Sequence, residues 1–157
     1  MTIKRLIEED LTNYKMPSML IGTARCSFKC DAPNHKWCQN RPLVQMPDEN
    51  KNDYDVVNLY LKNNLTQALI FAGLEPMDQF DEMIEVIKVF RQHTNDDIVI
   101  YTGYNKDEIQ DKVDYLKNNY VNIVIKFGRY IPNQKPHYDS VLGVELASDN
   151  QFAERVS

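Results

Sequence analysis

The chain has 157 residues, of which 43% are hydrophobic and 26% charged, and its formal net charge is −5 at pH 7. This length and composition are typical of one globular domain with an ordinary core. The net charge is negative and the sequence has no run of lysines or arginines, so nucleic-acid binding is disfavoured. Residues 1–16 lack the continuous apolar stretch of a signal peptide or a membrane span. We therefore expect a cytoplasmic protein that has neither nucleic acid nor membrane among its partners.

Four short apolar runs predict buried strands, and amphipathic segments between them predict helices. The runs cover residues 18–24, 67–73, 97–103 and 121–128. Helices are predicted over 53–63, 77–93 and 105–120, where apolar residues recur three and four positions apart. Near-continuous apolar strands that alternate with helices indicate a parallel sheet covered by helices. The sequence therefore predicts an α/β fold.

The remaining segments show no clear periodicity. Residues before Ser18 are a polar segment, and residues 25–51 form a long irregular loop whose prolines should break any helix or strand. From Arg129 onward the pattern fades into a loop and a terminal segment. We interpret residues 1–157 as a single domain, with a cysteine loop at 25–51 and a C-terminal tail at 129–157.

All three cysteines, Cys26, Cys30 and Cys38, lie within one short stretch of that loop. An odd number of cysteines in a reducing compartment argues against a disulfide framework and leaves metal binding, catalysis or burial. Two metal sites fit the pattern. With His35, the cysteines make a complete tetrahedral zinc site. Without it, three thiolates can hold three irons of a [4Fe–4S] cluster and leave the fourth iron open.

Further motifs follow the cysteine loop in a fixed order. Trp37 precedes the third cysteine, and Gln39 and Asn40 follow it; the later motifs are AGLEP at 72–76, YTGY at 101–104, FGRY at 127–130 and Asn150-Gln151. This arrangement, which runs from Leu20 to about Gln151, resembles the radical S-adenosylmethionine enzymes, and most of all the activating proteins of anaerobic ribonucleotide reductase. Seven residues separate Cys30 from Cys38, where that family usually has two.

The resemblance implies a fold, cofactors and site residues. A full eight-stranded barrel takes about 250 residues, so we expect a shortened, open (βα) partial barrel with a mainly parallel sheet of five or six strands. The implied cofactors are a [4Fe–4S] cluster held by Cys26, Cys30 and Cys38, and S-adenosylmethionine. The implied cofactor-binding residues are Trp37, Asn40, Gly73, Leu74, Glu75, Pro76 and Thr102. No catalytic side chain is implied beyond the cluster and the cofactor.

The activity implied by the resemblance is that of a radical S-adenosylmethionine oxidoreductase. It would generate a 5′-deoxyadenosyl radical and install a glycyl radical on an anaerobic ribonucleoside-triphosphate reductase, with an electron donor such as flavodoxin as a further partner. Two alternatives stay open. One is a small radical enzyme that acts on a metabolite such as a 7-deazaguanine precursor. The other is a non-enzymatic zinc-binding adaptor, in which His35 would be a ligand.

Overall fold

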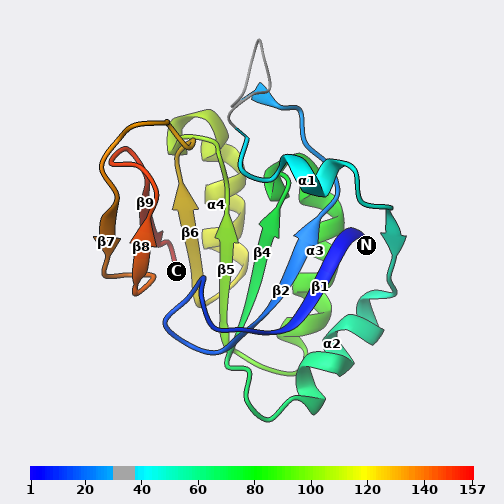
Figure 1. The fold of residues 1–157 in the computed structure, drawn as a ribbon. Helices are drawn as coiled ribbons and strands as arrows, with labels where there is room; N and C mark the ends of the chain where they lie inside the picture. Colours follow the sequence, from blue (N-terminus) through cyan, green and yellow to red (C-terminus); the bar gives the residue numbers. More distant parts are fainter. Residues whose placement is uncertain (30–37) are drawn as a thin grey trace.

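The computed structural model describes residues 1–29 and 38–157. Within them, seven strands form one open sheet in the order β3-β1-β2-β4-β5-β6-β9 (Figure 1). The central strands are parallel to one another: β2 (Ser18–Thr23), β4 (Ala68–Gly73), β5 (Asp97–Tyr101) and β6 (Ile123–Phe127). They match the four apolar runs of the sequence. The predicted α/β class and the open sheet are therefore confirmed.

The outer strands of the sheet are antiparallel to their neighbours. They are β1 (Thr2–Asp10), β3 (Glu49–Asn50) and β9 (Phe152–Arg155). The sheet has seven strands where the sequence predicted five or six, and the difference lies in these short or irregular outer strands. A separate two-stranded hairpin pairs β7 (His137–Asp139) with β8 (Val144–Leu146).

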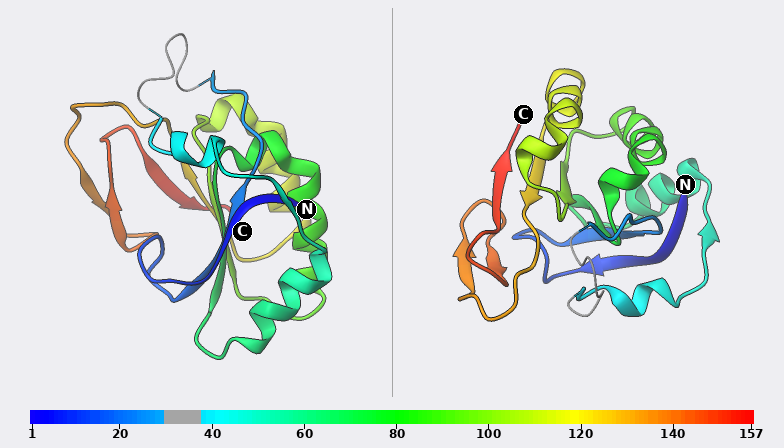
Figure 2. Two further views of the ribbon diagram at one scale, coloured as in Figure 1. Left: turned by 45° about the vertical axis from the view of Figure 1, so that its right-hand side comes forward. Right: turned by 90° about the horizontal axis from the view of Figure 1, so that it is seen from above.

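Three helices cover one face of the sheet (Figure 2). They are α2 (Asp53–Lys62), α3 (Phe80–Arg91) and α4 (Gln110–Asn119), as the periodicity predicts. Short 3₁₀ turns, η2 (Pro76–Gln79) and η3 (Lys106–Ile109), lead into α3 and α4. The Glu108 carboxylate accepts a hydrogen bond from the Asn105 backbone N–H at 2.8 Å, as the predicted capping box requires. None of the helices in the described part of the chain is long and apolar enough to cross a membrane.

The structure adds regular elements to the segments without clear periodicity, and the prediction that the prolines of residues 25–51 break any helix or strand is wrong. The polar N-terminal segment forms β1, whose register shifts between Ile3 and Arg5 and again between Ile7 and Asp10. These irregularities disturb the two-residue alternation that identifies a strand. The cysteine loop contains a short helix, α1 (Arg41–Val44), because Pro42 lies in its first turn, where proline is tolerated. The C-terminal tail contains β7, β8 and β9, which are too short to show a two-residue alternation of apolar and polar side chains.

Side chains on the two faces of the parallel strands enter different environments. On β5, Ile98 and Ile100 belong to the large core beneath the helices. Val99 belongs to a smaller cluster on the opposite face, which also includes Leu142 and Leu146 from the β7–β8 region. Buried side chains on both faces explain why these strands have near-continuous apolar sequences. The second face, which carries fewer apolar side chains, is where the candidate site lies.

The carboxyl ends of β2 and β4 approach each other closely at two glycines. Gly73 ends β4 with a φ of +95°. A Cβ at this position would lie 2.9 Å from both the Gly22 Cα and the Thr23 N. Both neighbours are backbone atoms of β2, so they have little freedom to move away. The turn after β4 therefore requires glycine for its dihedral angle and for its packing.

We expect Gly73→Ala to lower the free energy of unfolding by roughly 1–3 kcal/mol, because a side chain is strained at this φ and also meets β2. Urea unfolding followed by circular dichroism measures the change. Gly103→Ala is the matched control, since Gly103 is not among the glycines with positive φ. Equal losses in the two variants would contradict the close approach of β2 and β4.

Candidate metal and cofactor site

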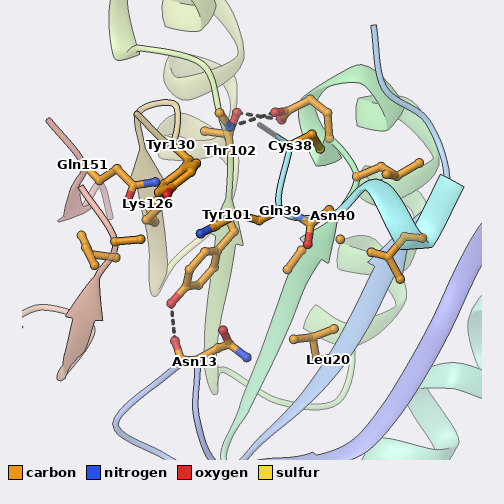
Figure 3. Close-up of a pocket in the computed structure, with 18 of the residues that line it drawn as sticks. Asn13, Leu20, Cys38, Gln39, Asn40, Tyr101, Thr102, Lys126, Tyr130 and Gln151 are labelled. Atoms are coloured by element: carbon orange, nitrogen blue, oxygen red, sulfur yellow. Dashed lines mark hydrogen bonds between the residues drawn. The ribbon is translucent and has the colours of Figure 1, made fainter. Parts of the chain in front are cut away.

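A cleft of about 490 Å³ lies on the sheet face opposite α2, α3 and α4 (Figure 3). Its wall includes residues at the carboxyl ends of β4, β5 and β6, Leu20 in the middle of β2, and residues of the β8 region. Ligands bind at the carboxyl ends of the strands in open parallel sheets. The predicted site residues that line it are Cys26, Cys38, Asn40, Gly73, Leu74, Glu75 and Thr102. Residues that are far apart in sequence thus meet in one cavity of ligand size.

Two of the three cysteines line this cleft. Cys26 and Cys38 are both partly exposed, and the backbone N–H of Phe28 donates to the Cys26 Sγ at 3.2 Å. Cys30, His35 and Trp37 lie outside the described residues. Among residues 1–29 and 38–157, no group of three metal-binding side chains gathers elsewhere. Two thiols that face one cavity fit a soft metal centre, such as an iron–sulfur cluster or zinc.

The turn after β4 lies next to the segment that leads to Cys26. Backbone hydrogen bonds join Leu74 N to Thr23 O at 3.3 Å and Glu75 N to Arg25 O at 2.8 Å. These bonds hold the AGLEP motif beside the start of the cysteine loop. Pro76 is buried and begins η2, rather than lining the cleft.

The side chains of Glu75 and Thr102 are hydrogen-bonded to each other. The Glu75 side chain is buried, and its carboxylate accepts hydrogen bonds from the Met77 N–H, the Thr102 hydroxyl and the Gly103 N–H at 3.0, 2.7 and 2.9 Å. Burial raises the pKa of Glu75 above its ordinary value, although these three hydrogen bonds act in the opposite direction. The pair joins the end of β4 to the end of β5, so both side chains help to shape the cleft wall.

Asn40 lies at the rim of the cleft, where the chain enters α1. Its carbonyl accepts a hydrogen bond from the Leu43 N–H at 3.0 Å, and the Cys38 carbonyl accepts one from the Arg41 N–H at 3.3 Å. The short helix therefore fixes the backbone that follows the third cysteine. Figure 3 shows Cys38, Gln39 and Asn40 on one side of the cleft, across from β6.

The sequence analysis missed Lys126, which lines the opposite wall (Figure 3). Lys126 is 7% exposed, and its ammonium donates to the Gly128 carbonyl at 2.8 Å. It occupies β6 beside Tyr101 of β5, whose hydroxyl donates to the Asn13 carbonyl. A lysine in the apolar run VNIVIKFG is the signal that could have identified it, because buried lysines are rare.

The FGRY and Asn150-Gln151 motifs also meet at this wall. The Gln151 side-chain amide donates to the Gly128 carbonyl at 3.3 Å, and the Asn150 amide donates to the Arg129 carbonyl at 2.9 Å. Gly128 has a φ of +95°, and a Cβ there would lie 3.0 Å from the Asn150 carbonyl oxygen. Packing between the two motifs therefore closes the cleft along β6. Gln151 lines the cleft itself.

Comparison with known proteins gives one family. The family model of the 4Fe-4S single cluster domain matches residues 19–146, which is most of the chain and includes all three cysteines. No curated protein and no solved structure matches the chain significantly. The match favours the iron–sulfur interpretation of the cysteine loop over zinc. The chain belongs to the 4Fe-4S single cluster domain family, a domain typical of radical S-adenosylmethionine enzymes.

Proposed function

We propose that this protein is a radical S-adenosylmethionine enzyme that installs a glycyl radical on an anaerobic ribonucleoside-triphosphate reductase. The observation that carries the proposal is the meeting of Cys26, Cys38 and the Gly73–Glu75 turn in one cleft at the carboxyl ends of parallel strands. Cys26, Cys30 and Cys38 would hold three irons of the cluster, and S-adenosylmethionine would bind beside the fourth. Family membership supports the cluster.

The cleft offers suitable groups for S-adenosylmethionine, which carries an amino group, a carboxylate and an adenosine. Backbone carbonyls of the turn at 73–75 would accept from the amino group. Lys126, a buried cation across the cleft, would pair with the carboxylate. Asn40 at the rim and Trp37, outside the described residues, are further candidates for contacts with the cofactor. The volume of about 490 Å³ is within the range of small-molecule sites.

When bound, the reduced cluster held by Cys26, Cys30 and Cys38 would supply one electron, and S-adenosylmethionine would supply a sulfonium bond that this electron can cleave, which gives the site the capacity to abstract a hydrogen atom. The residues of this chain would bind and orient the cofactor. An external one-electron donor such as flavodoxin would restore the cluster. The hydrogen atom would come from the Cα of a glycine in the partner and leave as part of 5′-deoxyadenosine.

A polypeptide substrate agrees with the open form of the sheet. The strand order begins with β3 and ends with β9, so the sheet does not close into a barrel around the cleft. A loop of a partner protein could therefore reach the cavity.

One observation favours a second candidate function, which is a small radical enzyme that acts on a polar metabolite. The cleft is also lined by the polar residues Asp10, Asn13 and Gln151.

Incubation with a reductase distinguishes these two functions. We expect the reconstituted protein, with reductant and S-adenosylmethionine, to produce a glycyl radical on the anaerobic ribonucleoside-triphosphate reductase from the same genome. Electron paramagnetic resonance detects the radical, and chromatography measures the 5′-deoxyadenosine formed with it. A reductase whose radical-bearing glycine is replaced by alanine is the control. Cofactor cleavage that the reductase neither accelerates nor converts into a glycyl radical would favour the metabolite enzyme.

Replacement of Lys126 tests the proposed contact with the cofactor carboxylate. We expect Lys126→Met to weaken binding of S-adenosylmethionine about tenfold or more, because a charge-assisted hydrogen bond is lost and methionine fills a similar volume. Titration of S-adenosylmethionine into the cluster-loaded protein measures the affinity. Lys88→Met is the matched control, since Lys88 is exposed on α3. Equal affinities in the two variants would remove Lys126 from the proposed site.

A further inference from the structure

The backbone just before and after Cys26 is held by one short segment, residues 75–79. Three hydrogen bonds join the two segments: Ala24 N to Gln79 Oε1 at 2.9 Å, Glu75 N to Arg25 O at 2.8 Å, and Ser27 N to Asp78 Oδ2 at 2.5 Å. The first two lie on the strand side of Cys26. Only the third lies on the far side, where the chain continues into the cysteine loop. Asp78 is therefore the contact from this segment that fixes the chain after the cysteine.

The Asp78 carboxylate uses its two oxygens for two different donors. Oδ2 accepts from the Ser27 backbone N–H, and Oδ1 accepts from the Tyr104 hydroxyl at 2.6 Å. The Tyr104 hydroxyl also lies 3.2 Å from the Ser27 Oγ. Tyr104 is held in turn, because its backbone N–H donates to the Thr102 hydroxyl oxygen at 3.0 Å. Asp78 thus connects the turn that follows β5 to the residue that follows Cys26.

The position of Ser27 bears directly on the Cys26 sulfur. Phe28 has a φ of +56°, and its backbone N–H donates to the Cys26 Sγ at 3.2 Å. An amide that points at the sulfur requires a tight turn over residues 26–28, and the turn conformation is uncommon for a phenylalanine. The Asp78 bond to Ser27 lies in the middle of this turn. Hydrogen bonds to cluster sulfurs are among the factors that set the reduction potential of iron–sulfur centres.

We infer that Asp78 is a positioning residue, which holds the Cys26 thiolate and its amide hydrogen bond in place for the cluster. The part of the inference that concerns the cluster rests on the proposed function, because it takes Cys26 as a cluster ligand. The part that concerns the turn does not. Asp78 acts through Ser27 and Phe28, and the Tyr104 hydroxyl keeps its carboxylate oriented.

Hydrogen exchange of the cluster-free protein tests the turn by itself. We expect Asp78→Ala to accelerate exchange of the amides at residues 26–28 at least tenfold, because the Ser27 N–H loses its acceptor. Asp81→Ala is the matched control, since Asp81 is exposed in the first turn of α3, and it should leave these amides unchanged. Unchanged exchange in Asp78→Ala would overturn the inference, whether or not the wild type binds a cluster.

Anaerobic reconstitution of the same proteins tests the consequence for the metal. We expect Asp78→Ala to bind less than half the iron and sulfide of the wild type, and the cluster that does form should have a shifted midpoint potential and an altered electron paramagnetic resonance signal. Tyr104→Phe keeps the hydrogen bond between Asp78 and Ser27, so it should lose less iron and sulfide than Asp78→Ala does. A cluster with wild-type content and potential in Asp78→Ala would overturn the role at the metal. If the wild type binds no cluster while the exchange difference between the wild type and Asp78→Ala is still observed, the proposed function is contradicted and the inference about the turn stands.

Discussion

The close approach of β2 to β4 is the constraint on which the site depends. Gly73 at the end of β4 has no Cβ, so its Cα can lie against the Gly22 Cα and the Thr23 N of β2, and its positive φ turns the chain back toward β2. This turn delivers Glu75 to the backbone of Arg25 and starts the segment that reaches Ser27. A larger side chain at Gly73 would separate the AGLEP motif from the cysteine loop. The first cysteine is therefore placed by strand packing.

One face of the sheet carries the main hydrophobic core, and the opposite face carries the candidate site. The helix-covered face contains the larger apolar core, which includes the most deeply buried aromatic side chains such as Phe71 and Phe90. The opposite face carries Lys126 and Tyr101, and the buried polar Glu75 and Thr102 line the cleft that opens there. Burial of polar groups costs stability unless they are hydrogen-bonded. The three hydrogen bonds that the Glu75 carboxylate accepts offset that cost at the edge of the proposed cofactor site.

Sequence reasoning identified the parallel core because its strands are short apolar runs between amphipathic helices. It missed β1, whose register shifts hide the alternation, and it missed α1, because a proline predicts a break in regular structure unless it lies in the first turn of a helix, as Pro42 does. Glu75 and Thr102 were both predicted at the site, but their mutual hydrogen bond spans 27 residues and depends on the pairing of β4 with β5. The role inferred for Asp78 has the same origin, since its partners are Tyr104, in the turn that follows β5, and Ser27, at the start of the cysteine loop.

The central claim is that the cysteine loop carries an iron–sulfur cluster with one iron open to S-adenosylmethionine. Anaerobic reconstitution with iron and sulfide, followed by reduction and electron paramagnetic resonance with and without S-adenosylmethionine, tests it most directly. The account predicts a reduced-cluster signal that changes when S-adenosylmethionine is added. A protein that holds one zinc, takes up no cluster and gives no response to S-adenosylmethionine would contradict it.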